Sequence, residues 1–305
     1  MTDYGHDLLF GTFVTPSAQD VAQVLDLTVA ADREGLDLVT FQDHPYQPAY
    51  LDTWTLLSYA AARTERVRLS GNVLSLPLRP PAVLARAAAS LDVLSGGRFE
   101  LGLGAGAFWD GIAAMGGRRL TPAEGVDALR EGIAIIRGLW DTETRGGLRF
   151  DGTYYQAAGA KRGPRPAHDI GVWVGAYKPR MLELTGSVAD GWLPTVEYLP
   201  RGVGSLPGLN ARIDDAAVAA GRSPADVRRL LNVMNVDLGG PSRGLLQGPA
   251  DQWTEQLTDL ALTHGVTAVL IGGDDLTTTE RFAAEVAPAV REAVARERGR
   301  VLSGG

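Results

Sequence analysis

The chain has 305 residues, 45% of them hydrophobic, and carries a net charge of -7 with a pI near 5.2. Nucleic-acid-binding proteins present a basic face, so this acidic chain is expected to have no nucleic-acid partner. It contains no cysteine, which excludes disulfides, thiolate catalysis and cysteine-ligated metal.

The N-terminal residues do not combine a basic run with an apolar run, so we expect no secretory signal. No apolar stretch of the sequence is long enough to span a bilayer. We therefore predict a cytoplasmic protein that does not interact with a membrane. The histidines His6, His44, His168 and His264 show no metal-ligand spacing, so we expect no bound metal.

In the first half of the chain, short β-prone runs alternate with runs of helical periodicity. Strands are expected at 8–14, 36–41, 67–74 and 99–103, and helices at 19–34, 53–64, 81–94 and 122–140. The helix at 81–94 begins with a proline, which the first turn of a helix tolerates.

The same alternation continues in the second half. Strands are expected at 171–175, 191–194, 230–238 and 266–271, and helices at 180–188, 209–220, 250–264 and 279–296. Eight strand–helix pairs imply parallel strands joined by right-handed crossovers. We therefore predict one (β/α)8 TIM-barrel domain over residues 1–305.

Two stretches interrupt the alternation, at about 141–169 and 197–208. The first contains a segment, 148–156, that is typical of a small hairpin. Long insertions after barrel strands often shape the rim of an active site. Inert surface loops are the alternative interpretation.

Reactive groups of such barrels lie where strands end, and Asp43-His44 follows the second predicted strand. A carboxylate beside an imidazole suits acid–base work on a redox ring, although the pair could also cap a loop.

Two further strand ends indicate a cofactor. Gly102, Gly104 and Gly106 form a glycine-rich turn, which either lets the backbone approach a ligand or makes a tight connection. Gly175 to Pro179 joins a strand to a helix, whose free N–H groups could bind a phosphate, as Lys178 and Arg180 could too.

These residues resemble those of the bacterial luciferase-like oxidoreductases. The resemblance extends from about residue 8 to about residue 288 and rests on four blocks in order: Asp43-His44, residues 91–106 with Leu-Ser-Gly-Gly-Arg-Phe, Val174-Gly-Ala, and Ala189-Asp-Gly-Trp.

The resemblance implies coenzyme F420, or alternatively FMN, at the mouth of the barrel. It places Asp43 and His44 at the redox ring as the catalytic pair, and Asn72-Val73 at a bulge behind the ring, often with a non-proline cis peptide. The remaining cofactor-binding residues that we expect are Gly104, Ala105, Gly106, Asp110, Gly175, Ala176, Tyr177, Lys178, Arg180 and Met181.

The sequence departs from the deazaflavin-dependent sugar-phosphate dehydrogenases at Ala107, where those enzymes carry a glutamate, and it shows no basic cluster for a sugar phosphate. This argues against sugar-phosphate oxidation and favours an apolar organic substrate. The side chains expected to contact that substrate are Phe13, Tyr46, Phe108, Trp109, Trp192 and Glu197.

Three functions are compatible with these observations. The leading hypothesis is hydride transfer between coenzyme F420 and the substrate. The second is an FMN-dependent monooxygenase that uses O2 and reduced flavin from a partner flavin reductase. The third is a cofactor-binding protein without turnover. Relatives commonly pair through barrel helices, so we expect a homodimer.

Overall fold

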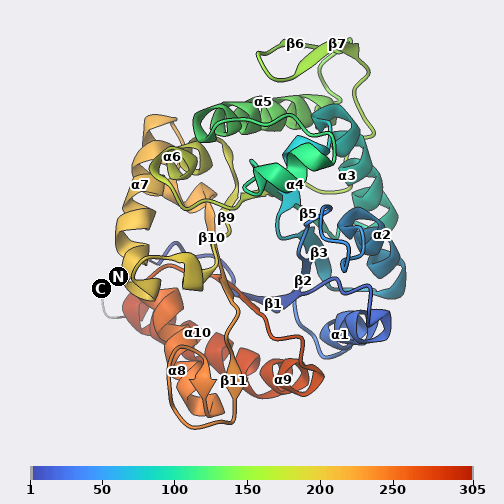
Figure 1. The fold of residues 1–305 in the computed structure, drawn as a ribbon. Helices are drawn as coiled ribbons and strands as arrows, with labels where there is room; N and C mark the ends of the chain where they lie inside the picture. Colours follow the sequence, from blue (N-terminus) through green and yellow to red (C-terminus); the bar gives the residue numbers. More distant parts are fainter. Residues whose placement is uncertain (1–2, 304–305) are drawn as a thin grey trace.

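The alternating strands and helices close into a parallel barrel (Figure 1) in the computed structural model, which describes residues 3–303. The strands pair in the order β3-β2-β1-β13-β10-β9-β8-β5, and a β3–β5 pairing completes the circle. The predicted eight-stranded barrel is confirmed. Its strands are β1 Leu9–Val14, β2 Leu38–Phe41, β3 Arg68–Gly71 with its continuation β4 Leu74–Ser75, β5 Phe99–Gly104, β8 Val172–Val174, β9 Gly191–Trp192, β10 Arg228–Val233 and β13 Ala268–Ile271.

Helices surround the barrel on its outer side (Figure 1). The helix α5 shows why they begin where they do: Thr121 and Glu124 form a capping box, and Pro122 occupies the first turn. The helices are α1 Val21–Arg33, α2 Thr53–Arg63, α3 Pro81–Ser95, α4 Trp109–Ala114, α5 Pro122–Trp140, α6 Pro179–Val188, α7 Leu206–Ala219, α8 Ala250–Leu262, α9 Leu276–Arg281 and α10 Ala287–Ser303.

The apolar residues form two buried layers. A large cluster fills the space between the strands and the helices. A smaller one lies inside the barrel and consists of Phe13, Leu38, Trp173, Leu193, Leu230, Ala268 and Leu270. Because packed side chains fill the interior, a ligand can reach only the mouth of the barrel.

Several boundaries differ from the sequence prediction. The strand expected at 67–74 is divided between Asn72 and Val73 by a non-proline cis peptide, of the kind that the resemblance led us to expect there. The strand expected at 230–238 leaves the barrel after Val233, and its last residues, β11 Asp237–Leu238, pair with β12 Gln247–Gly248. The last helix contains a π-helical segment, Phe282–Val286, between α9 and α10.

The interruption at 141–169 contains the predicted hairpin, formed by β6 Leu148–Asp151 and β7 Gln156–Ala160. It projects beyond the helices next to α5 (Figure 1). The segment after it returns to the barrel at His168. The hairpin residues do not line the cavity described below.

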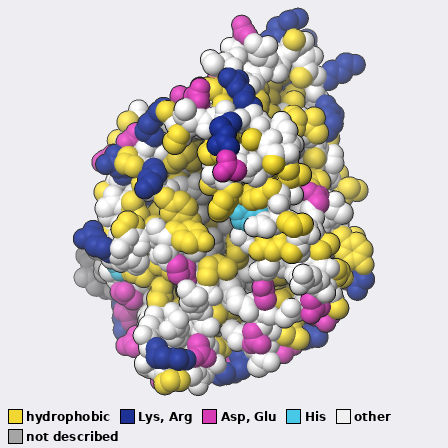
Figure 2. Space-filling model, viewed as in Figure 1, with side chains coloured by type: hydrophobic (Ala, Val, Ile, Leu, Met, Phe, Trp, Pro, Cys, Tyr) yellow, Lys and Arg dark blue, Asp and Glu magenta, His cyan; other side chains and the backbone are white. Residues whose placement is uncertain are grey.

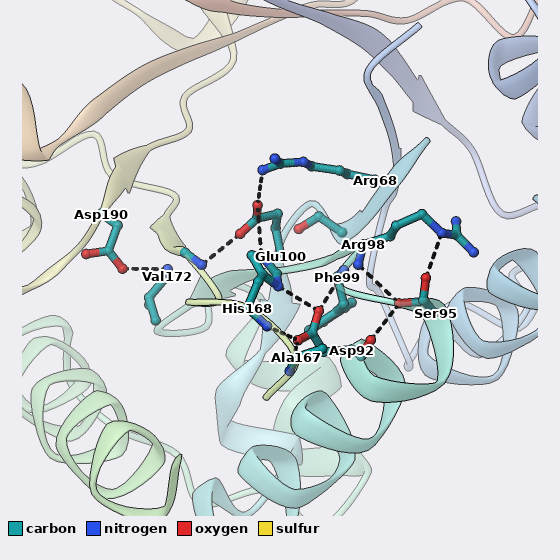
Figure 3. A network of polar contacts seen from close by, with 12 residues as sticks. Arg68, Asp92, Ser95, Arg98, Phe99, Glu100, Ala167, His168, Val172 and Asp190 are labelled. Atoms are coloured by element: carbon teal, nitrogen blue, oxygen red, sulfur yellow. Dashed lines mark hydrogen bonds and ion pairs between the residues drawn. The ribbon is translucent and has the colours of Figure 1, made fainter. Parts of the chain in front are cut away.

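A network of polar contacts fastens this returning segment to the N-terminal ends of the strands (Figure 3). The fully buried carboxylate of Asp92 accepts hydrogen bonds from the amides of Ala167 and His168, at 2.7 and 3.1 Å, and lies 2.8 Å from Nδ1 of His168. Glu100 of β5 accepts from the amide of Gly171 and pairs with Arg68. The Leu-Ser-Gly-Gly-Arg-Phe block therefore lies at the end opposite the mouth.

Among the described residues, no helix is both long and apolar enough to cross a membrane.

Replacing His168 with alanine should destabilise the protein in a pH-dependent way. The contact with Glu100, together with the charges of Glu100 and Asp92, raises the pKa of His168 above its usual value of 6.5 against the opposing effect of burial. This stabilisation is complete below pH 6.5 and is lost as the pH rises through the higher pKa of the folded state. We expect His168→Ala to lower the free energy of unfolding by about 2 kcal/mol at pH 6 and by less at pH 9, measured in urea. An equal loss at both pH values would contradict this assignment.

Candidate active site

A cavity of about 1090 Å³ opens at the C-terminal ends of the barrel strands. Its walls come from the ends of β1 and β10, from the segments that follow β2, β3, β5, β8 and β9, and from the first turns of α5 and α6. Viewed as in Figure 1, hydrophobic side chains gather around the middle of the molecule, with a histidine among them (Figure 2).

Most of the residues singled out in the sequence meet in this cavity, although they come from distant parts of the chain. Those that line it are Phe13, Asp43, His44, Tyr46, Asn72, Val73, Gly104, Ala105, Gly106, Phe108, Trp109, Gly175, Tyr177, Lys178, Arg180 and Met181.

Asp43, which is 4% exposed, connects the end of β2 to the segment after the cis peptide. Its carboxylate accepts the amide of Ser75 at 2.8 Å and forms an ion pair with Arg79 at 3.0 Å. Arg79 also pairs with Asp52 at 3.2 Å. Burial lowers the pKa of Arg79, but the bonds to the two carboxylates outweigh burial and raise it above its usual value. Asp43 is thus already engaged in fixing the loop.

His44 is half-buried and forms a hydrogen-bonded pair with Tyr46. Its Nδ1 lies 2.6 Å from Oη of Tyr46, and its ring meets the edge of Phe108 at 5.3 Å. Burial lowers the pKa of His44 below 6.5, although the charge of Asp43 opposes this shift. Burial and the same charge raise the pKa of Tyr46 to about 12. The pair is therefore neutral near pH 7.

Asn72 and Asn232 form a buried amide pair across the barrel. Asn72 Nδ2 donates to Oδ1 of Asn232 at 2.8 Å, and Asn232 Nδ2 donates to Oδ1 of Asn72 at 3.1 Å. Thr40 and Thr195 accept the remaining amide hydrogens, at 3.1 and 3.2 Å. This polar layer forms the floor of the cavity and fixes the backbone next to the cis peptide.

The glycine-rich turn after β5 forms one wall. Gly106 has a φ of +90°, and a Cβ there would lie 2.9 Å from Pro77 and 3.0 Å from Ile112. A side chain at Gly104 would come within 2.8 Å of Val73. Glycine is therefore required for the backbone to run this close to the cavity.

The start of α6 forms another wall and presents unbonded donors. Among the described residues, no acceptor is bonded to the amides of Ala176, Tyr177 or Lys178, and no side chain caps the helix. The hydroxyl of Tyr177 accepts the amide of Thr195 at 2.9 Å, which fixes its ring at the rim. Such a helix start is suited to a phosphate.

Four predicted site residues do not line the cavity. The indole of Trp192 is buried and donates to the carbonyl of Ala176. The carboxylate of Glu197 accepts the amides of Met234 and Asn235 and so joins two loops. Asp110, whose side chain is 98% exposed, pairs with Arg119. The side chain of Ala176 is buried, so only its backbone could serve a ligand.

Other lining residues were not predicted. Some lie at the start of α5, which packs on the glycine-rich turn and so becomes part of the wall. Ser75 and Asn232 had a usable signal, because each is a polar residue near the end of an apolar run. The unpredicted residues are Gln42, Leu74, Ser75, Ala107, Ile112, Pro122, Ala123, Gly125, Val126, Pro179, Leu193, Thr195, Tyr198, Asn232 and Met234.

The role of Asp43 in fixing the loop can be tested by charge removal. Asp43→Asn keeps the shape of the side chain but leaves the buried Arg79 with Asp52 as its ionic partner. We expect the free energy of unfolding to fall by about 2 kcal/mol. The matched control, Asp52→Asn, removes a half-exposed charge and keeps a good helix cap, so its effect should be below about 1 kcal/mol. Equal effects in urea unfolding would refute the assignment.

Curated relatives align with more than half of this chain. An F420-dependent glucose-6-phosphate dehydrogenase of Amycolatopsis mediterranei (strain U-32) is 32% identical over 219 residues, which are 69% of this chain and 63% of that protein. One of Beutenbergia cavernae is 38% identical over 181 residues, 56% of this chain and 52% of that protein. The chain thus spans less than two thirds of the length of these relatives.

Solved structures share the fold at lower identity. An F420-dependent secondary alcohol dehydrogenase in complex with an F420-acetone adduct has a TM-score of 0.80 at 16% identity, covering 93% of this chain and 99% of that one. A monooxygenase, RslO1 from Streptomyces bottropensis, has a TM-score of 0.76 at 22% identity, covering 92% and 99%.

The family model described as luciferase-like monooxygenase matches residues 4–236, most of the barrel and of the cavity wall. The resemblance seen in the sequence is thereby confirmed. The chain belongs to the luciferase-like monooxygenase family.

Proposed function

We propose that this protein is an oxidoreductase that transfers a hydride between coenzyme F420 and a neutral, apolar organic substrate. The observation that carries the proposal is the cavity itself. It combines a neutral histidine–tyrosine pair, at the end of β2, with unbonded amides and two cations at the start of α6. The named relatives are F420-dependent dehydrogenases, which supports the same choice of cofactor.

The residues present fit such a cofactor. The hydroxyl of Ser75 is buried in the cavity wall without a partner among the described residues, as expected of a group that a ligand would satisfy. The amides of Ala176 to Lys178 would hold the phosphate, and Val73 with the glycine-rich turn would face the ring. When bound in its reduced form, the deazaflavin supplies a hydride. The role of His44 would be to exchange a proton with the oxygen atom of the substrate.

The charges in the cavity argue against a sugar phosphate as substrate. Its lining cations are Lys178 and Arg180, both at the start of α6, where the phosphate of the cofactor would lie. Near His44, the guanidinium of Arg79 is paired with two carboxylates. The rest of this wall is aromatic, with Tyr46, Phe108 and Trp109. An uncharged substrate suits this surface better than an anion does.

An FMN-dependent monooxygenase is the second candidate, because the start of α6 would bind the phosphate of FMN equally well. The likeness in fold to monooxygenases supports this alternative. It would require a partner flavin reductase and O2.

We also propose a homodimer that pairs through α2 and α3. Val83 and Leu94 lie about three turns apart on one face of α3 and are 66% and 85% exposed. Tyr59 of α2 is 49% exposed. Exposed apolar side chains of this kind mark protein interfaces, and light scattering of the purified protein tests the pairing.

The cytoplasmic location stays a prediction.

Direct titration tests the choice of cofactor. We expect coenzyme F420 to bind more tightly than FMN, as followed by its fluorescence. A deazaflavin lacking the phosphate should bind about tenfold to a hundredfold more weakly than F420, because it forgoes charge-assisted hydrogen bonds at α6. Tighter binding of FMN would favour the monooxygenase. Equal binding with and without the phosphate would show that the start of α6 does not bind the phosphate.

His44→Ala should separate catalysis from folding. Because His44 lies at the cavity and carries little core packing, we expect the melting temperature to change by only a few degrees. Turnover per folded molecule should fall by about a hundredfold to ten-thousandfold. Unchanged turnover together with lost stability would show that His44 only caps the loop.

A further inference from the structure

The titratable side chains in the cavity differ in their freedom to exchange protons. Asp43 is committed to its ion pair and to a backbone amide. The amide of Thr195 holds the hydroxyl of Tyr177 at the rim, and Tyr198 lies in solvent at the rim, 72% exposed. The two cations belong to the start of α6. Among the described lining residues, His44 and Tyr46 are the two neutral titratable side chains that are hydrogen-bonded to each other, which makes them the best placed to pass a proton to a substrate.

The hydrogen bond within this pair has a preferred direction. A phenol is a much stronger acid than a neutral imidazole N–H, and an imidazole nitrogen is a much stronger base than a phenol oxygen. The stronger bond therefore has Tyr46 Oη donating to Nδ1 of His44, across 2.6 Å. The single ring proton of neutral His44 then resides on Nε2, which no other described residue bonds.

The position of the phenol is fixed by packing. A Cβ on Gly111 of α4 would lie 2.7 Å from Cγ of Tyr46, so the helix backbone lies directly against the ring. The amide of Gln47 donates to the carbonyl of His44, and the amide of Ala18 donates to the carbonyl of Ala49, which holds the loop on the barrel. The pair is thus arranged by the protein alone, before any ligand binds.

We propose that Tyr46 is a positioning residue that fixes His44 as its Nε2–H tautomer, and that the site consequently donates a proton to the oxygen of a neutral carbonyl substrate. This rests on the proposed function for the source of the hydride, a reduced deazaflavin. It assigns to Tyr46 a role beyond contact with the substrate, and it names a ketone or aldehyde, with the corresponding alcohol, as the substrate class.

The proton movements balance. As a hydride reaches the carbonyl carbon, the electron pair of the C=O π bond moves to oxygen, which takes the proton from Nε2 of His44. In the same step, Nδ1 takes the proton of Tyr46 Oη. Tyr46 then recovers this proton from Nδ1 while Nε2 takes a proton from water, which restores the starting tautomer. Alcohol oxidation follows the same path in reverse. Throughout the cycle, the histidine never has to hold a lasting positive charge, which its half-buried position disfavours.

Nuclear magnetic resonance of the cofactor-free protein tests the tautomer directly. With 15N-labelled histidine, the chain gives signals from four residues, and His44→Gln assigns the one of interest. We expect Nε2 to carry the proton in the wild type and the preference to weaken in Tyr46→Phe. A proton on Nδ1 in the wild type, or an unchanged spectrum in Tyr46→Phe, would overturn the proposal.

Kinetics test the consequence. With a neutral ketone and reduced F420, Tyr46→Phe should lower kcat by about tenfold to a hundredfold and leave the Kd for F420 unchanged. Tyr50→Phe is the matched control: its ring lies 6.4 Å from that of His44 and does not line the cavity, so kcat should stay at the wild-type value. A wild-type kcat in Tyr46→Phe would refute the relay. If F420 fails to bind at all, the proposed function fails, while the tautomer measurement still decides the role of Tyr46.

Discussion

The mouth of the barrel depends on the buried carboxylate of Asp43, through its ion pair with Arg79 and its hydrogen bond from the amide of Ser75. Asp43 binds the segment after the cis peptide through the amide of Ser75 and the loop after β2 through its own backbone, and it neutralises Arg79. Because a buried charge needs its partner, these segments cannot separate without a large cost in free energy. His44 and Tyr46 follow immediately in the chain, so their positions derive from this anchor. Asp43, which the sequence analysis placed with His44 as a catalytic pair, therefore supports the His44–Tyr46 pair in our proposal and does not itself exchange protons.

The two ends of the barrel use their polar groups differently. At the N-terminal ends, Asp92 and Glu100 have several partners each, and the network stabilises the fold. At the C-terminal ends, the hydroxyl of Ser75 and the amides at the start of α6 lack partners among the described residues. A buried hydroxyl left unsatisfied in this way reduces stability, as expected of a group that a ligand would satisfy. The Leu-Ser-Gly-Gly-Arg-Phe block thus supports stability, whereas the cavity at which we propose the chemistry lies at the opposite end.

The extent to which the sequence predicted the structure depended on the distance between interacting residues. Alternating periodicity predicted the barrel, and position after a strand predicted His44, because both are local properties of the chain. The pair of Asn72 and Asn232 could not be predicted, since 160 positions separate them and only barrel closure brings them together. Glu197 follows a strand as His44 does, but its partners lie in another loop and draw it away from the cavity. Position in the chain therefore indicated which residues approach the mouth, whereas tertiary contacts decided which of them face it.

The neutrality of the inner cavity connects these features to the chemistry. Asp43 and Asp52 cancel the charge of Arg79, and burial keeps His44 and Tyr46 uncharged near pH 7. The remaining cations lie at the start of α6, where an anionic cofactor tail would use them. Hydride transfer delivers a hydrogen with its electron pair to the carbon atom of a carbonyl group. The reduction then requires one further proton, which must reach the oxygen atom. In the mechanism that we propose, the short bond between a phenol and an imidazole would provide that proton without placing a fixed charge beside the substrate. The same absence of fixed charge is compatible with the aromatic side chains of the adjoining wall, and it supports our proposal of a neutral carbonyl substrate rather than a sugar phosphate.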